Sequence, residues 1–409
     1  MTVIVCGGGA AGMIAAGTAA KTADEVILIE KNDALGRKLR ITGKGRCNIT
    51  NACEIEDMIE MYPVNGKFLY SALYTFTNDS IVELLNEYGV ETKVERGGRV
   101  FPVSDDARDV VFAMRKYALQ PNVRLVKEEV KDIITDNGKI KGVKGALRQY
   151  SGDKVILCCG GASYPQTGSD GSGYKLARKA GHTLIEPTPS LVPLVTREKW
   201  CADVMGLSLK NVEVTAYNSK NKKLYSGFGE MLFTHFGVSG PLILSLSAHI
   251  KKELKNGVKI KIDLKPALSE QQLDTRILRD FSQQKNKHII NALDALMPKK
   301  LIPIVIKLAD IEPHKAVCEI TREERKQLLD VLKGLTLNIT DFRPINEAII
   351  TSGGVKTSEI NSSTMESKLV SGLYFAGEII DVDGYTGGFN LQVAWSTGYL
   401  AGLNAGLEN

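Results

Sequence analysis

Apolar and polar positions at the start of the chain follow the order strand, glycine turn, helix, strand. The apolar run "TVIVC" precedes Gly7, Gly9 and Gly12, and the Ala- and Gly-rich segment "AAGMIAAGTAAK" follows. A second apolar run, "DEVILIEK", contains Glu30. Glu30 follows the glycines at about the 20-residue separation that is typical of a dinucleotide-binding βαβ unit.

The three glycines have different physical tasks in such a unit. The first permits a tight turn, the second lets the backbone approach a pyrophosphate, and the third lets the helix pack closely on the strand. The helix N-terminus, where Ala11 lies, adds free N–H groups and a partial positive charge. We therefore expect a nucleotide site here, with Glu30 accepting a hydrogen bond from a ribose.

Two later segments repeat the order of strand, glycine loop and helix. They are "KVILCCGGASYPQTGSDGSGYKLARKAGHTL" and "SGLYFAGEIIDVDGYTGGFNLQVAWSTGYLAGLNAG". The strand that ends before Gly377 needs a sheet to join, and the N-terminal sheet is the expected host. The segment 36–51, "GRKLRITGKGRCNITN", has no helical or strand period, so we expect a long functional loop there. Asn137-Gly138 predicts a hairpin turn.

The middle of the chain has a different pattern. Residues 195–265 contain alternating apolar runs, and residues 269–334 indicate helices with capping boxes at Ser269 and Thr321 and a C-cap at Gly334. We predict an α/β protein whose Rossmann-like nucleotide-binding domain is discontinuous, formed by residues 1–187 and 341–409. An α+β insert spans 188–340, with a small β unit over about 188–265 and helices over about 266–340.

Composition excludes several classes of protein. The chain has 43% hydrophobic and 24% charged residues, and no apolar stretch is long enough to span a membrane. Nothing before the first strand could serve as the basic region of a signal peptide, and the seven cysteines include no C-x-x-C pair. We expect a cytoplasmic protein without disulfides or a bound metal.

The net charge is +5, and lysines concentrate at 251–265 and 298–307. Such lysines indicate either a solvated surface or attraction to an anionic partner, such as a nicotinamide cofactor or RNA.

Several long motifs together resemble one family. These are "TGKGRCNITN", "SYPQTGSDGSGY", "TPSLVPL", "GEMLFTHFGVSGPLIL", "TSGGV" and "TMESKLVSGLYFAGEIIDVDGYTGGFNLQVAWSTGYLAG". They are similar to the BaiN/YhiN-like FAD-dependent oxidoreductases, which belong to the flavoproteins with two dinucleotide-binding domains. The resemblance runs from the first strand to the last helix and implies that FAD lies across the Rossmann sheet.

The resemblance also implies roles for individual positions. Gly377 and Glu378 match the terminal motif in which related flavoproteins carry Gly-Asp, and Arg37 with Lys38 matches a basic pair at the adenosine side. The helix that begins at Gly388 is expected to direct its N–H groups at the negative end of a reduced flavin. The full set of expected FAD-binding residues is Gly7, Gly9, Ala11, Gly12, Glu30, Lys31, Arg37, Lys38, Gly43, Gly45, Arg46, Cys47, Asn48, Val130, Gly161, Gly377, Glu378, Gly388, Asn390, Leu391 and Gln392.

Candidate catalytic side chains are few. His235 could donate a proton or hold the substrate, and Tyr385 could cover the flavin ring or donate a hydrogen bond; the alternative for each is a packing residue. Cys47 lacks a resolving partner, which argues against a disulfide reductase. The glycines at 168, 171 and 173 are in the wrong order for a second dinucleotide fingerprint, so NADH or NADPH would bind transiently.

The family resemblance leaves the reaction open. We expect a NAD(P)H-dependent reductase of a C=C bond beside a ketone in a small steroid- or bile-acid-like substrate. The alternatives are an amine oxidase that releases hydrogen peroxide and a flavin-dependent tRNA-modifying protein. No aromatic-rich basic ribbon is visible in the sequence, so nucleic acid is not the expected partner.

Overall fold

The computed structural model describes residues 1–407. The chain divides into two compact units, one formed by Met1–Ser190 with the segment from Ile345 onward, and the other by Leu191–Pro344. The sequence places the insert at 188–340. We describe each unit by itself.

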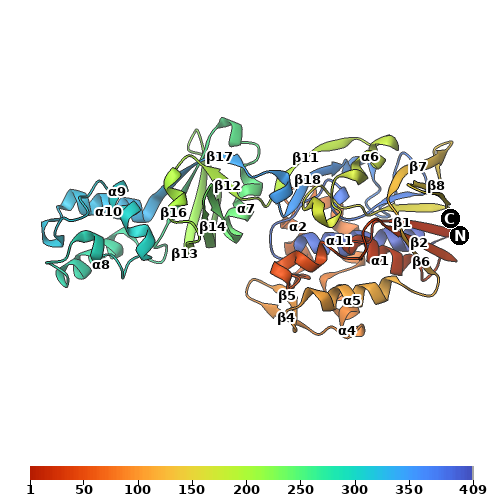
Figure 1. The fold of residues 1–409 in the computed structure, drawn as a ribbon, viewed down its shortest axis with the longest axis horizontal. Coiled ribbons are helices and arrows are strands. Elements are labelled where there is room, and N and C mark those ends of the chain that lie inside the picture. The colour runs from red at the N-terminus through yellow and green to blue at the C-terminus, as the bar shows by residue number, and fades with distance from the viewer. Residues whose placement is uncertain (408–409) are drawn as a thin grey trace. The chain divides into compact units, whose positions relative to one another are not determined.

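A five-stranded parallel sheet forms the centre of the first unit, in the order β19-β10-β1-β2-β6 (Figure 1). Its strands are β1 (Thr2–Cys6), β2 (Glu25–Glu30), β6 (Val123–Lys127), β10 (Lys154–Leu157) and β19 (Leu373–Phe375). β1 and β2 are nearly continuous buried runs, as expected for strands covered on both faces. β19 pairs with β10, so the prediction that the C-terminal strand joins the N-terminal sheet is confirmed.

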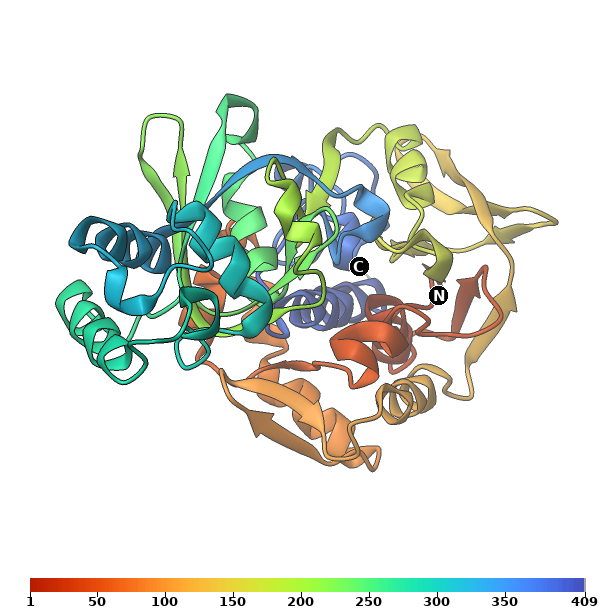
Figure 2. The ribbon, with the colours of Figure 1, turned by 60° about the vertical axis from the view of Figure 1, so that its left-hand side comes forward.

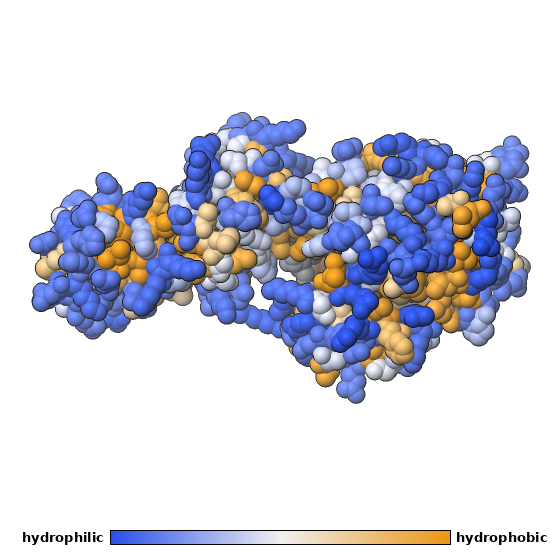
Figure 3. Space-filling model, viewed as in Figure 1, coloured by the Kyte–Doolittle hydropathy of each residue, from blue (hydrophilic) through white to orange (hydrophobic). Residues whose placement is uncertain are grey.

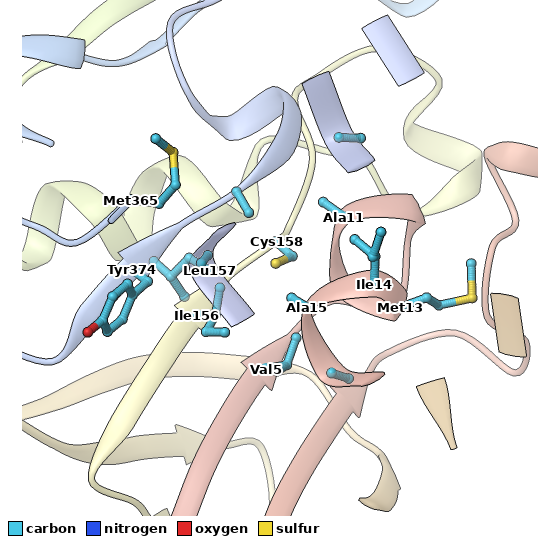
Figure 4. Packing of buried hydrophobic residues seen from close by; sticks show 14 of the residues in the cluster. Val5, Ala11, Met13, Ile14, Ala15, Ile156, Leu157, Cys158, Met365 and Tyr374 are labelled. Carbon is cyan, nitrogen blue, oxygen red and sulfur yellow. The ribbon is translucent and has the colours of Figure 1, made fainter. Parts of the chain in front are cut away.

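Helices α1 (Ala10–Ala19) and α11 (Phe389–Ala405) pack on each other, and α5 (Ala107–Ala118) also contacts α1. A Cβ added at Gly398 or Gly402 of α11 would lie 2.5 Å from the carbonyl oxygen of Ala11 or Ala15. The Ala and Gly content of both helices therefore allows their backbones to touch. Figure 4 shows Ala11 and Ala15 of α1 close to Cys158, which follows β10.

Smaller elements complete the first unit. The helices are α2 (Ile55–Glu60), α3 (Tyr70–Thr75), α4 (Asn78–Glu87) and α6 (Ser172–Lys179). Two three-stranded sheets have the orders β3 (Thr50–Asn51), β5 (Arg99–Pro102), β4 (Thr92–Glu95) and β7 (Val130–Asp136), β8 (Lys139–Gly145), β9 (Gln149–Ser151). A two-stranded sheet pairs β11 (Leu184–Ser190) with β18 (Ile350–Val355). The predicted turn at Asn137-Gly138 is confirmed, with φ of 48° and 75°.

The segment 36–51 is more regular than its sequence suggests. It contains a 3-10 helix over Leu39–Gly45 and ends in β3. Gly43 and Lys44 have positive φ and interrupt the helix. This interruption explains why no period is visible in the sequence.

The second unit contains a closed six-stranded barrel in the order β12-β15-β14-β13-β16-β17 (Figure 2). Its strands are β12 (Leu194–Thr196), β13 (Ser208–Asn218), β14 (Lys223–Thr234), β15 (Gly237–Ser239), β16 (Val258–Asp263) and β17 (Leu335–Phe342). Along β16, Val258, Ile260 and Ile262 are buried while Lys259 and Lys261 alternate with them. Such alternation is typical of a barrel with an apolar interior.

The helices of this unit are α7 (Pro241–Ile250), α8 (Glu270–Ser282), α9 (Ile302–Leu308) and α10 (Arg322–Gly334). The capping boxes predicted at Ser269 and Thr321 are confirmed. The predicted C-cap at Gly334 is wrong, because Gly334 is the last helical residue and Leu335 caps the helix with φ −55°. The chain enters β17 directly and needs no left-handed residue there. Across the described residues, no helix has both the length and the apolarity to cross a bilayer.

Candidate functional site

An open cavity lies at the carboxyl ends of the parallel strands of the first unit. Gly7 follows β1, and Cys158 and Cys159 follow the neighbouring strand β10; all three line the cavity. β2 and β6 extend the sheet on one side of β1, and β10 and β19 extend it on the other. Ligands of open α/β sheets bind where the strand order reverses in this way.

The three glycines of the first turn differ in what a side chain would meet at each position. Gly7 has φ 105°, and a Cβ there would lie 2.5 Å from the carbonyl oxygen of Cys158. A Cβ at Gly12 would lie 1.8 Å from the carbonyl oxygen of Gly7, so this glycine lets α1 approach β1. A Cβ at Gly9 would meet no protein atom within 4 Å, although Gly9 lines the cavity.

The protein itself therefore explains Gly7 and Gly12 but not Gly9. Gly9 has φ −77°, which every L-residue adopts easily, so backbone strain does not explain it either. A missing side chain at Gly9 leaves free space in front of the first turn of α1, which has no side-chain cap and no acidic residue. Free N–H groups beside free space form a place for a phosphate group.

Glu30 lies at the end of β2 and lines the cavity. One carboxylate oxygen accepts the N–H of Gly8 at 2.6 Å. The other accepts the backbone N–H and the side-chain amide of Asn32 at 2.8 and 2.7 Å. These bonds fix the carboxylate at the cavity wall, and the oxygen that accepts only the Gly8 N–H keeps a lone pair that a ribose hydroxyl could use.

The basic pair Arg37-Lys38 divides between two parts of the cavity. Arg37 donates to the Asn32 side-chain oxygen at 2.9 Å, so it lies beside Glu30. Lys38 instead pairs with Glu378 at 2.6 Å and donates to Ser163 at 2.6 Å. The half-buried Glu378 carboxylate thus holds the Lys38 ammonium group, and a role of Lys38 at the adenosine side stays a prediction.

At the start of α11, Asn390 and Leu391 line the cavity but Gly388 and Gln392 do not. A Cβ at Gly388 would lie 2.3 Å from the backbone of Thr50, so this glycine serves the packing of α11 on β3. Gln392 is fully buried and accepts a hydrogen bond from the Thr50 hydroxyl at 2.7 Å.

Residues 43–48 do not line the cavity. With its amide oriented to satisfy both groups, Asn48 accepts the N–H of Gly388 at 3.0 Å. Arg46 forms ion pairs with Glu95 and Asp105. Neither side chain is free to meet a ligand in the cavity.

The structure thus brings together only some of the residues expected from the sequence. Those that line the cavity are Gly7, Gly9, Ala11, Glu30, Lys31, Arg37, Lys38, Val130, Gly377, Glu378, Asn390 and Leu391. Those that do not are Gly12, Gly43, Gly45, Arg46, Cys47, Asn48, Gly161, Gly388 and Gln392. Some of the second group pack against residues of the wall, as Gly161 shows: a Cβ there would lie 2.7 Å from Glu378.

Sequence reasoning missed one wall of the cavity almost completely. This wall includes Cys158, Cys159, Gly160, Thr167, Gly168, Ser169 and Ser172, from the loop and helix after β10. The signal was present, because the strand and glycine-rich loop were recognised. The sequence does not show that β10 pairs with β1, and this pairing brings the loop after β10 close to Gly7.

The two candidate catalytic residues lie in different units. His235 is exposed in the turn between β14 and β15 of the second unit, with its ring 4.9 Å from that of Phe236. Tyr385 of the first unit is half-buried, and its backbone N–H donates to Met61 at 3.0 Å. Tyr385 does not line the cavity. Both roles stay predictions.

Thiol chemistry is disfavoured in this site. Burial raises the pKa of Cys159 to about 12, despite the opposing charge of Lys31. Burial likewise raises the pKa of Cys47 to about 12 and that of Cys6 well above its ordinary value. A thiol is a nucleophile only as thiolate, so these side chains remain neutral and serve as small packing groups.

Comparison with known proteins agrees with this architecture. Residues 1–404 match the family described as the HI0933-like protein Rossmann domain. The chain belongs to this family. The match covers both units, and it confirms the family resemblance inferred from the motifs.

Two relatives of the chain align over almost their whole length. A 3-dehydro-bile acid delta(4,6)-reductase of Clostridium scindens is 33% identical over 405 residues, covering 98% of each chain. A ribosomal RNA dihydrouridine synthase of Haemophilus influenzae is 31% identical over 412 residues, covering 98% of this chain and 97% of the relative. Among solved structures, a flavocytochrome c3 fumarate reductase shares the fold, with a TM-score of 0.53 and 16% identity, covering 99% of this chain and 78% of that one.

Proposed function

We propose that this HI0933-like protein is an FAD-dependent oxidoreductase that reduces a C=C bond conjugated to a carbonyl group. The two named relatives support the reaction class, because their printed activities share one chemistry. A 3-oxo steroid with a double bond at C4 is an enone, and dihydrouridine differs from uridine by two hydrogens across a bond conjugated to a carbonyl. The proposal therefore concerns the reaction that both activities have in common.

The observation that carries the cofactor assignment is the free space at Gly9. It lies before the uncapped N-terminus of α1, where a pyrophosphate would meet N–H groups and the positive end of the helix dipole. Glu30 and Val130 would hold the adenosine half, because both line the same cavity. FMN would leave these groups unused, so we propose FAD.

A bound flavin supplies the hydride transfer, and the protein supplies position and electrostatics. Asn390 and Leu391 bring the first turn of α11 to the far part of the cavity, where N–H groups would stabilise negative charge. Asn390 is held in place, since it accepts the N–H of Gly384 at 2.8 Å and donates to the carbonyl of the same residue at 2.8 Å. The Lys38–Glu378 pair, with an N–O distance of 2.6 Å, fixes the carboxylate at the cavity wall.

NADH or NADPH is the proposed reductant, and an amine substrate with release of hydrogen peroxide is the alternative. Anaerobic stopped-flow absorbance separates them. The proposal expects rapid bleaching of the flavin by NADH or NADPH and re-oxidation by an enone or a uridine-containing RNA. Bleaching by a small amine, with no response to either nicotinamide, would overturn it.

Between the two substrates, the distribution of charge favours RNA. Residues 191–344 contain 25 lysines and arginines against 17 acidic residues, a net charge of +8, whereas the rest of the chain has 27 against 30, a net charge of −3. A basic unit attracts a polyanion far more strongly than a steroid with one carboxylate. We therefore propose a uridine in RNA as the substrate, and the steroid-like enone expected from the sequence as the second candidate.

Nucleoside analysis by mass spectrometry compares the two candidates directly. Reduced enzyme is given an unmodified ribosomal RNA transcript in one reaction and a 3-oxo-Δ4 steroid in another. Formation of dihydrouridine supports the RNA proposal. Reduction of the steroid with no dihydrouridine in the transcript would establish the second candidate instead.

A further inference from the structure

Five exposed lysines of the second unit lie at one end of its barrel. Lys220 and Lys222 are exposed in the turn between β13 and β14, and Lys223 is exposed at the first position of β14. The buried Asn218 holds this turn, because its side-chain oxygen accepts the N–H groups of Lys220 and Lys222 at 3.0 and 2.9 Å. The lysines are therefore presented from a fixed turn.

A second basic segment emerges beside this turn. Lys252 and Lys255 are exposed just before β16, and a short 3-10 helix, Leu254–Asn256, shapes the backbone there. Val258 at the start of β16 pairs with Asn218 at the end of β13, so both turns leave the barrel at the same end. Figures 1 and 2 show them projecting together, and this end is hydrophilic in Figure 3.

These five lysines are not neutralised by neighbours. Across the described residues, no ion pair involves any of them, although Glu253 lies in the same segment. Some other lysines of the unit are paired, as Lys315 is with Glu324 at 2.7 Å. Unpaired lysines on two adjacent rigid turns create a concentrated positive potential.

Strand pairing adds an aromatic side chain to this basic surface. Tyr217 lies between Lys223 and Lys259 across the neighbouring strands, and the Lys261 ammonium is 5.9 Å from its ring centre. Phe228, further along β14, is 56% exposed. The aromatic and basic positions that are separate in the sequence thus lie on one outer face, which is the composition of a nucleic-acid-binding groove.

We infer that this basic end of the barrel, formed by Lys220, Lys222, Lys223, Lys252 and Lys255 with Tyr217, binds the phosphodiester backbone of RNA. The inference rests on the proposed function for the choice of RNA as the partner. Lysine ammonium groups contact phosphates without reading sequence, and Tyr217 offers a stacking face for an unpaired base. The surface would supply affinity, whereas the cavity of the first unit would select the reacting base.

The test uses the full-length protein and an unmodified ribosomal RNA transcript as the probe. The variant Lys222→Glu/Lys223→Glu/Lys255→Glu is compared with a matched control, Lys299→Glu/Lys300→Glu/Lys307→Glu. The control changes the same number of charges on exposed lysines in the helical part of the same unit. Circular dichroism and flavin content check that both variants are folded.

Fluorescence anisotropy is expected to show at least tenfold weaker RNA binding by the first variant. The slope of log K against log salt should fall by about 2–3, because each lost phosphate contact contributes about 0.7–0.9. The control should stay within about twofold of the wild type. Equal losses in both variants, or none in the first, would overturn the assignment of this surface.

The surface and the proposed function can fail separately. If wild-type protein binds the transcript through these lysines but forms no dihydrouridine, the surface stands and the proposed reaction fails. If the wild type and the first variant form dihydrouridine with the same KM, the reaction stands and the surface fails.

Discussion

Replacing Gly9 with alanine should separate cofactor binding from folding. A Cβ at Gly9 would meet no protein atom within 4 Å, and φ −77° with ψ −168° suits alanine. The apoprotein should therefore tolerate the change. FAD should not, because the new methyl group occupies the space in which the pyrophosphate would approach the backbone.

Two small effects on the apoprotein oppose each other. Loss of glycine from the unfolded chain stabilises by about 0.4–1 kcal/mol. Alanine is a poorer N-cap residue than glycine, which costs about 0.5–1 kcal/mol at the start of α1. The free energy of unfolding of the Gly9→Ala apoprotein should therefore stay within about 1 kcal/mol of the wild type.

The effect on the cofactor should be much larger. We expect FAD affinity to fall at least tenfold, which corresponds to about 1.4 kcal/mol or more. FAD at 100 times its Kd stabilises a folded protein by about 2.7 kcal/mol. For a unit of this size that is about 5–10 °C in Tm. Wild-type apoprotein should show this shift at a fixed FAD concentration, and Gly9→Ala should show little of it.

Gly12→Ala is the matched comparison, because it adds the same methyl group one helical turn away. Its Cβ would lie 1.8 Å from the carbonyl oxygen of Gly7, so the apoprotein itself should lose about 2–3 kcal/mol. Thermal unfolding with and without FAD, together with flavin absorbance after purification, measures both quantities. A Gly9→Ala protein with wild-type FAD content would refute the reasoning, since the space at Gly9 would then serve no pyrophosphate.

Three further changes test other parts of the site and fold. Glu30→Ala removes the carboxylate that accepts the Gly8 N–H; FAD retention should weaken by about 1–3 kcal/mol in equilibrium dialysis, and unchanged affinity would place the ribose elsewhere. Gly388→Val sets a side chain 2.3 Å from the Thr50 backbone at φ 103°; the apoprotein should lose about 3 kcal/mol in urea unfolding, and wild-type stability would contradict this packing. Burial lowers the pKa of His182, so its contribution to stability is present above the unfolded pKa of about 6.5 and is lost as the pH falls towards the lower folded value. Urea unfolding at pH 7.5 and 5.5 should therefore show a smaller loss for His182→Gln than for the wild type, and equal losses would exclude this titration.

The layers of the fold could be predicted because sequence patterns within short segments indicate them. A strand ending in Gly7 and an Ala-rich helix imply a βαβ unit, and the apolar run before Gly377 has no partner near it in the sequence. The parallel sheet follows from those two facts. The closed barrel did not follow, because the sequence shows alternating runs but not which strand pairs with which, and closure depends on the pairing of β12 with β17.

The site could be predicted from the sequence where one short segment provides both the turn and the residues that line the cavity. Gly9, Glu30 and Leu391 are of this kind, and all line the cavity. The pairing of Lys38 with Glu378 could not be predicted, because the two residues lie 340 positions apart in the sequence. Gly388 and Gln392 were placed in the site because they begin the correct helix, but Thr50 determines which side of that helix they occupy.

A glycine motif by itself therefore mixes two kinds of information. Gly7 and Gly12 are fixed by contacts within the protein, so they would be needed in any βαβ unit with this close approach of helix and strand. Gly9 meets no such neighbour, and it is also the N-cap of α1, where glycine is preferred over alanine. In this chain the two outer glycines of the G-x-G-x-x-G motif serve packing, whereas the middle glycine leaves the space that the proposed FAD would use.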